Sequence, residues 1–318
     1  MFIFIFSLRH ITSTTGSIGA AAAVSKLLGL SIEQTSHALG VAATQVTGLR
    51  EMFGSHTKSF HPGRAAQSGL IAAILAQGGY TSSETAIEAK RGWANVVGAT
   101  KTGIPESLNK WLGMDSSSVG LVSEKGGRWE ILRNSFKPYP CGIVIHPVID
   151  GCSQLHRDMN AMGLRVADIH SVKARVHPLV LELTGKRKPK DGLEGKFSVF
   201  HGGAIGLIYG KGTPSQYEDA VVTDPGVIEV RDKIDCEADT AIRADETRIV
   251  LTMRDGRVLE KHVEHAVGSI EVPMDDQMLR QKFEDQCAAV LGGEVKSASA
   301  KCWNVEEVGD IGELARLL

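Results

Sequence analysis

A stripe of small residues in the segment "PGRAAQSGLIAAILAQGG", residues 62–79, restricts most strongly how this chain can fold. Pro62 is suited to the first position of a helix, and the pair Gly78–Gly79 is suited to its end. Within this helix, small residues recur at steps of four, three and four: Ala65, Gly69, Ala72 and Ala76. Such a stripe lets a second helix approach closely. The other positions are largely apolar, so the helix is predicted to be central; they include Leu70, Ile71, Ile74 and Leu75.

Two more helices are expected before this one and another after it. Ser17 is a candidate N-cap for the first helix, and Ser31 with Gln34 three residues later forms a capping box for the second. A further helix is expected from about residue 83 to 93. Residues 1–130 are therefore predicted to form a helical domain.

The character of the chain changes after Gly126–Gly127, and residues 131–268 are predicted to form an α+β domain. Branched residues alternate over residues 168–183, which favours a strand. The segment 247–264 has the pattern of a hairpin with an Asp–Gly turn. Between them, "KFSVFHGGAIGLIYG" is typical of a buried helix capped by Ser198.

After Pro273 the pattern is helical again, in "DDQMLRQKFEDQCAAVL" and "NVEEVGDIGELARLL". The order is thus helical, then α+β, then helical. We expect residues 269–318 to return to the helical domain, which gives a mostly α fold with an inserted α+β domain.

Composition excludes several classes of function. The 318 residues are 42% hydrophobic and 23% charged, with a net charge of −2 and one short basic tract, "GKRKPK". This balance argues against a nucleic-acid or membrane-surface role. The apolar start "MFIFIF" is too short for a signal-peptide core or a membrane span. Five scattered cysteines without CxxC spacing favour a reduced, intracellular protein, either cytoplasmic or in the mitochondrial matrix of a eukaryote.

Familiar metal and cofactor motifs are absent from the sequence. It contains no HExxH, no paired CxxC and no GxSxG. His56 and His61 lie five positions apart, and His262 and His265 are expected on opposite faces of a strand. Neither pair suits a metal ion. No metal and no cofactor are expected.

Three basic residues lead into the helix that carries the small-residue stripe: Lys58, His61 and Arg64. Free backbone amides at a helix N-terminus add partial positive charge, so this position suits a carboxylate or phosphate. The structural alternatives are a surface lysine, a histidine that caps the helix and an arginine paired with an acidic residue.

Other basic residues lie at junctions of the chain. Lys137 is in a Pro-rich turn next to the expected domain boundary, with His146 nine residues later, and His10 precedes a Gly-punctuated helix start. The alternatives here are a solvent-exposed lysine and an interior histidine with its hydrogen bonds satisfied.

Three blocks in this order resemble the MmgE/PrpD family: "GSHTKSFHPGRAAQSGLIAAILAQGGY", "SFKPYPCGIVIHPVID" and "GKFSVFHGGAIGLIYG". The family includes 2-methylcitrate dehydratase, cis-aconitate decarboxylase and iminodisuccinate epimerase. The resemblance runs from about His10 to the C-terminus. It implies a large all-helical domain and a smaller α+β lid, with the site in the cleft between them, no metal or organic cofactor, and a homodimer.

The resemblance also implies active-site roles for His10, Lys58 and Lys137, and His61 matches the histidine that follows the Thr–Lys pair. In a polycarboxylate site, lysines and helix amides hold carboxylates while histidines transfer protons. The predicted catalytic residues are His10, Lys58, Lys137 and His146; the predicted substrate-binding residues are His61 and Arg64.

Two departures from the family pattern bear on function. Family members carry a long N-terminal helical segment with active-site groups, and this chain is expected to begin after it. Gly142 stands where the animal-type decarboxylase has a histidine. The sequence predicts a cofactor-independent lyase of the dehydratase type, acting on a small di- or tricarboxylate such as 2-methylcitrate, citrate or aconitate. The alternatives are an epimerase or isomerase, a decarboxylase of a related polycarboxylate, and a truncated member without activity.

Overall fold

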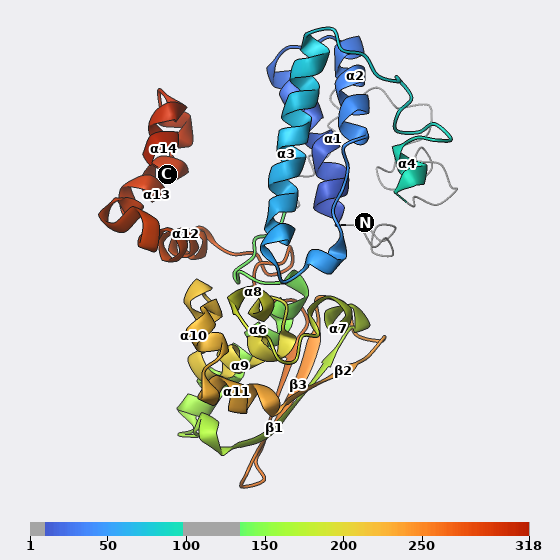
Figure 1. Cartoon of the computed structure of the whole chain (residues 1–318). Coiled ribbons are helices and arrows are strands. Elements are labelled where there is room, and N and C mark those ends of the chain that lie inside the picture. The colour runs from blue at the N-terminus through green and yellow to red at the C-terminus, as the bar shows by residue number, and fades with distance from the viewer. Residues whose placement is uncertain (1–9, 98–133, 318) are drawn as a thin grey trace. The chain divides into compact units, whose positions relative to one another are not determined.

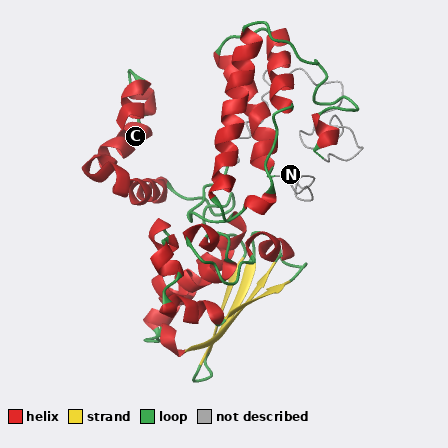
Figure 2. Ribbon diagram, in the orientation of Figure 1, coloured by secondary structure: helices red, strands yellow, loops and turns green. Residues whose placement is uncertain are grey.

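The computed structural model describes residues 10–97 and 134–317, which belong to two compact units, Met1–Trp129 and Glu130–Leu318. The described part of the first unit is helical, and the second combines helices with one small sheet (Figure 2). A mostly helical chain with a small α+β part is therefore as predicted. The apolar start and Gly126–Gly127 lie outside the described residues. The lid arrangement and the return of the C-terminal helices stay predictions.

Three long helices lie side by side in the first unit (Figure 1). They are α1 (Ile11–Leu27), α2 (Ile32–Ala43) and α3 (His56–Gln77). The predicted capping box of α2 is confirmed, because Ser31 Oγ accepts a hydrogen bond from the Gln34 amide and Gln34 Oε1 accepts one from the Ser31 amide, both at 3.1 Å.

The small-residue stripe of α3 packs against α1, as its spacing predicts. Ala65, Gly69, Ala72 and Ala76 are all buried. A Cβ atom added to Gly69 would lie 2.6 Å from the Ala21 nitrogen and 2.7 Å from the Ser17 carbonyl oxygen. Only glycine fits at this point of the contact.

The predicted starts of α1 and α3 were wrong. Ser17 is buried inside α1, which begins at Ile11. The helix runs through its early threonines, whose hydroxyls donate to carbonyls four residues back, as Thr14 Oγ1 does to His10 at 2.9 Å. Pro62 lies inside α3, which begins at His56. The proline ring fixes φ near the helical value, so it restricts a residue whose backbone is already helical.

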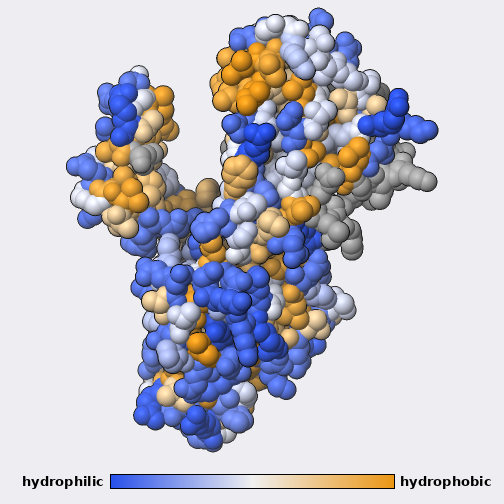
Figure 3. Space-filling model, in the orientation of Figure 1, coloured by the Kyte–Doolittle hydropathy of each residue, from blue (hydrophilic) through white to orange (hydrophobic). Residues whose placement is uncertain are grey.

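The prediction that α3 is central was also wrong for the part of the chain that the structure describes. Between 38% and 52% of each large apolar residue on its other side is exposed. Figure 3 shows hydrophobic side chains gathered on the surface of this unit. The exposed α3 residues are Leu70, Ile71, Ile74 and Leu75.

The helix predicted over residues 83–93 does not form. Residues 84–92 make turns, and a single-turn helix α4 follows at Trp93–Val96. The chain folds back so tightly at Gly92 that an added Cβ would lie 2.7 Å from the Ala86 carbonyl oxygen. This compact turn replaces the continuous helix.

The second unit is built on a four-stranded mixed sheet of order β2-β1-β3-β4. The strands are β1 (Ile169–Val176), β2 (Ile234–Ala238), β3 (Thr247–Met253) and β4 (Val258–Val263). The predicted hairpin is confirmed as antiparallel β3–β4, with Gly256 at a φ of 88° in its turn. The parallel strand β2 was not predicted.

The strand predicted over residues 168–183 ends early, at Val176. Pro178 has no amide hydrogen for a strand ladder and instead opens helix α7 (Pro178–Thr184). His177 caps this helix, since its Nδ1 accepts a hydrogen bond from the Leu179 amide at 3.1 Å.

Two helices form the core of this unit together with the sheet: α6 (His146–Ala161) and α9 (Val199–Tyr209). The buried helix α9 is confirmed, including its cap, because Ser198 Oγ accepts from the His201 amide at 3.1 Å. Glycines allow α9 to approach α6, and an added Cβ at Gly206 would lie 2.8 Å from Cys152 Cβ. Helix α6 was not predicted.

The remaining elements are short or lie near the C-terminus. The predicted helix at residue 275 is confirmed as α12, whereas the pattern over residues 304–318 splits because Asp310 Oδ1 accepts from the Gly312 amide and starts a new helix. The α-helices are α8 (Gly192–Gly195), α10 (Asp219–Val222), α11 (Pro225–Asp232), α12 (Asp276–Leu291), α13 (Val295–Trp303) and α14 (Ile311–Leu317). The 3₁₀ turns are η2 (Arg50–Met52), η5 (Ile143–Ile145), η6 (Val166–Asp168), η7 (Pro214–Tyr217), η8 (Gly292–Glu294) and η9 (Val305–Glu307).

The contact between α1 and α3 makes a stability prediction. Gly69→Ala should lower the free energy of unfolding by about 1–3 kcal/mol, because the added methyl overpacks the helix contact. Gly63→Ala is the matched control in the same helix, since an added Cβ there meets nothing within 4 Å. It should raise the free energy of unfolding by up to about 1 kcal/mol through helix propensity. Urea denaturation of both variants measures the difference, and equal effects would contradict the proposed contact.

Candidate functional site

Two of the predicted site residues form a direct pair in the first unit. His10 precedes α1 and His61 lies in α3, and their Nδ1 atoms are 2.9 Å apart. Both residues are buried: 9% of His10 and 7% of His61 is exposed to solvent. The backbone amide of His10 donates to the Gly48 carbonyl at 3.1 Å, and Gly48 has a φ of 107° that suits glycine. The hydrogen bond to the backbone at Gly48 helps to hold His10 next to α3.

Burial and a nearby cation keep both imidazoles neutral. The pKa of His10 is lowered to about 4, mainly by burial, then by the Lys58 ammonium and then by His61. Burial is also the main cause that lowers the pKa of His61, followed by Lys58. Lys58 lies one turn before His61 on α3. The structure therefore brings together three of the residues that the sequence singled out, in one unit.

Arg64 is placed differently from this group. It lies on an exposed part of α3, and its Nη1 donates to Gln67 Oε1 at 2.8 Å. Among the described residues, Arg64 forms no ion pair with an acidic residue, which was the structural alternative. Its predicted role in binding substrate stays a prediction.

A second group surrounds the start of α6 in the other unit. Lys137 is exposed as a residue, but its Nζ donates to the Cys141 carbonyl at 3.1 Å. Burial of the Lys137 ammonium lowers its pKa, whereas the nearby Cys141 raises it by a smaller amount. Lys282 from α12 lowers it further. This ammonium is therefore partly shielded from water.

His146 is the first residue of α6 and only 3% of it is exposed. The pKa of His146 is lowered to about 3, mainly by burial and then by the Lys137 charge. The ring of Tyr139 meets it edge to face at 5.2 Å between centroids. Its Nε2 atom is buried without a hydrogen-bond partner among the described residues. Backbone hydrogen bonds with Cys141 and Tyr139 oppose the lowering of the His146 pKa, so the hydrogen-bonding capacity of this interior histidine is satisfied in part.

The sequence did not single out Tyr139, Cys141 and Lys282, which complete this second group. Burial raises the pKa of Cys141 to about 12, so its thiol stays protonated. The turn "KPYPCG" was a usable signal for Tyr139 and Cys141, since it lies between Lys137 and His146. Lys282 gave no such signal because it lies in an ordinary amphipathic helix distant in the chain.

Two cavities in the described part of the chain are lined by none of the six predicted residues. One, of about 350 Å³, lies between α12 and a surface that includes Pro138 and Pro214. The other, of about 730 Å³, lies in the first unit between the end of α2 and Trp93. We assign no ligand to either cavity.

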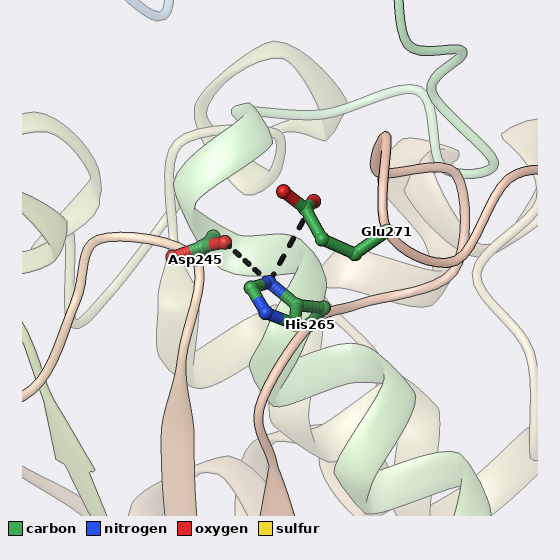
Figure 4. A group of neighbouring side chains, drawn as sticks. All are labelled: Asp245, His265 and Glu271. Carbon is green, nitrogen blue, oxygen red and sulfur yellow. Dashed lines mark hydrogen bonds and ion pairs between the residues drawn. The ribbon is translucent and has the colours of Figure 1, made fainter.

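Asp245, His265 and Glu271 gather at the end of the sheet (Figure 4). His265 Nδ1 lies 2.8 Å from Asp245 and 3.7 Å from Glu271. Arg243 already brings a positive charge here, with its Nε 3.4 Å from Asp245 and its Nη2 3.3 Å from His265 Nε2. An ion-pair network explains this arrangement, and we assign no metal to it. His262 points elsewhere, to Glu246 at 2.8 Å.

Two family domains cover most of the chain. Residues 5–103 match the MmgE/PrpD N-terminal domain, and residues 139–305 match the MmgE/PrpD C-terminal domain. The chain belongs to the MmgE/PrpD family. The His10–His61 pair lies in the N-terminal family domain and His146 lies in the C-terminal one. None of the described helices is long and apolar enough to cross a membrane.

The chain is similar to several characterised members of the MmgE/PrpD family. A cis-aconitate decarboxylase-like protein of Aspergillus oryzae is 26% identical, over 97% of this chain and 64% of the relative. Human cis-aconitate decarboxylase is 22% identical, over 97% and 62%. The 2-methylcitrate dehydratase of Escherichia coli is 25% identical, over 79% and 52%. The chain thus spans less than two thirds of the length of these relatives.

The buried state of His146 predicts a dependence of stability on pH. Folding lowers its pKa from 6.5 to about 3, so only the unfolded chain takes up a proton in that window. The free energy of unfolding should fall as the pH decreases below about 6.5, by up to about 1.4 kcal/mol per pH unit for each such imidazole. Urea denaturation between pH 4 and pH 7 should show a shallower slope in His146→Gln. The exposed His170 supplies the control His170→Gln, which should keep the parent slope; an unchanged slope in His146→Gln would contradict the assignment.

Proposed function

We propose that this MmgE/PrpD chain is a cofactor-independent lyase of the dehydratase type that acts on a small di- or tricarboxylate such as 2-methylcitrate, citrate or aconitate. The observation that carries the proposal is the presence of buried, neutral imidazoles whose pKa is lowered by burial and by the charge of a nearby lysine. It occurs at His10 and His61 with Lys58, and again at His146 with Lys137. The family resemblance implies active-site roles for residues of both groups.

The chemistry of dehydration matches these groups. Loss of water from a hydroxy acid requires a base for the proton beside a carboxylate and an acid for the departing hydroxide. A histidine that is neutral at pH 7 can accept that proton. Ammonium groups can hold the carboxylates and stabilise the negative charge that develops on them.

Bound substrate would also adjust the strength of the bases. The pKa of His10, about 4, is low for a general base at neutral pH. Carboxylates bound next to Lys58 would offset its positive charge and raise the pKa of the neighbouring imidazole toward neutrality. The site would then be most basic when the substrate is in place.

The names of the relatives support the substrate class. The similar proteins are named as cis-aconitate decarboxylases and 2-methylcitrate dehydratases, and both names concern tricarboxylates. The identities of 22–26% and the partial coverage of their length leave the particular substrate as part of the proposal. A homodimer, as the family resemblance implies, is proposed with it.

Gly142 favours dehydration over decarboxylation. The resemblance places a histidine at this position in the animal-type decarboxylase. Here an added Cβ would lie 2.8 Å from the Thr184 side chain, so the packing around Gly142 leaves little room for an imidazole. His146, four residues later, is the first residue of α6 and does not occupy that position.

The reaction can be tested with a panel of polycarboxylates. The full chain is incubated with 2-methylcitrate, citrate and cis-aconitate, and the products are followed by alkene absorbance and by CO₂ release. New alkene absorbance from a hydroxy acid is expected. CO₂ release would favour the decarboxylase instead, and deuterium exchange beside a carboxylate without alkene formation would favour an epimerase. No change with any compound would favour a member without activity.

Lys58 makes the sharpest test of carboxylate binding. Lys58→Ala should weaken binding of the tricarboxylate by about 10-fold to 100-fold, because a contact to a charged group contributes about 1.5–3 kcal/mol. Stability should change little. Lys26→Ala is the matched control, since Lys26 is an exposed basic residue in the last turn of α1. Isothermal titration calorimetry measures both, and unchanged affinity in Lys58→Ala would remove Lys58 from the site.

A further inference from the structure

The His10–His61 contact leaves room for one proton between the two rings. Their Nδ1 atoms are 2.9 Å apart, which is a hydrogen-bond distance. If both Nδ1 atoms carried hydrogen, the two hydrogens would collide; if neither did, two lone pairs would face each other. One ring must donate and the other must accept.

This single hydrogen bond sets the outer nitrogens of the two rings in opposite states. In a neutral pair, the ring that donates through Nδ1 has a bare Nε2, which is a base. The ring that accepts at Nδ1 carries its proton on Nε2, which is an acid. The pair therefore offers one base and one acid at the same time.

The surroundings of the two histidines keep the pair neutral, with one proton on each ring. Both rings are buried, and the Lys58 charge acts on each of them, which disfavours a second proton. The ring of Phe53 meets His10 edge to face at 5.3 Å. In residues 10–97 and 134–317, no carboxylate forms a hydrogen bond with either ring. His61 thus has the position that an acidic residue often has beside an active histidine.

We infer that His61 sets the location of the proton on His10, and that the two histidines together act as a one-proton relay. The role in turnover rests on the proposed function. The base Nε2 takes a proton from the carbon beside a carboxylate. The Nδ1 proton of that ring crosses to the other Nδ1, and the second ring gives up its Nε2 proton to the departing hydroxide. Water leaves, and the pair ends with its two tautomers exchanged. Proton exchange of the two Nε2 atoms with water, and return of the Nδ1 proton, restore the first arrangement before the next turnover.

Nuclear magnetic resonance of the full chain tests the resting pair. With ¹⁵N-labelled histidine, two-bond ¹H–¹⁵N spectra distinguish an Nδ1–H ring from an Nε2–H ring. We expect one of each between pH 6 and pH 8, assigned by the signals lost in His10→Asn and His61→Asn. Two Nε2–H rings, or two doubly protonated rings at pH 6, would overturn the pair.

Two substitutions at position 61 separate positioning from packing. His61→Asn keeps a hydrogen-bonding atom near the place of Nδ1 but has no second ring nitrogen, whereas His61→Phe keeps only ring volume. His10 should keep one tautomer in the Asn variant and show a mixture in the Phe variant. His37→Asn, at another histidine of the same unit, is the control. A single unchanged tautomer in His61→Phe would overturn the positioning role.

Turnover tests the relay separately from the proposed function. His61→Asn should lower kcat by about 100-fold, the low end of general acid–base effects, with KM within about threefold of the parent. Undiminished kcat in this variant would overturn the relay. Failure of the parent chain to turn over any polycarboxylate would count against the proposed function alone, because the spectra decide the state of the pair without a substrate.

Discussion

Close helix contacts that only glycine allows determine where the ionisable groups of this chain lie. In the second unit, Gly202 and Gly206 let α9 pack onto α6, and an added Cβ at Gly202 would lie 2.6 Å from Ile145. That contact buries the start of α6, where His146 is the first residue. In the first unit, Gly69 and Ala65 hold α3 against α1, which brings His61 to the residue that precedes α1, His10. The packing of small residues therefore determines the positions of the histidines that the proposed chemistry uses.

Burial then decides the charge state of these groups. An imidazole removed from water loses the hydration that favours its charged form, so its pKa falls. This is the first cause of the lowered pKa at His10, His61 and His146, and a lysine charge acts in the same direction at each. The result is neutral nitrogen bases beside ammonium groups. Such a combination suits a ligand that brings several negative charges and a proton to be removed.

In this chain each of the two MmgE/PrpD domains carries this combination, which supports the proposed polycarboxylate chemistry. The two groups differ in one respect. The first has a hydrogen bond between its imidazoles, whereas the second leaves His146 Nε2 without a partner among the described residues. The relay is therefore inferred for His10 and His61 and not for His146.

The sequence by itself determined the features that depend on residues a few positions apart. The capping box at Ser31, the Ser198 cap of α9 and the Asp–Gly turn of the β3–β4 hairpin were all predictable, because each is set by local hydrogen bonds or backbone preference. The resemblance to the MmgE/PrpD family also pointed to His10, Lys58 and Lys137. Only the tertiary structure decided that His10 and His61, 51 positions apart, share a hydrogen bond and that β2 pairs in parallel with β1. It also showed that one side of α3 is exposed. These outcomes depend on which surfaces meet and exclude water, and no short pattern along the chain carries that information.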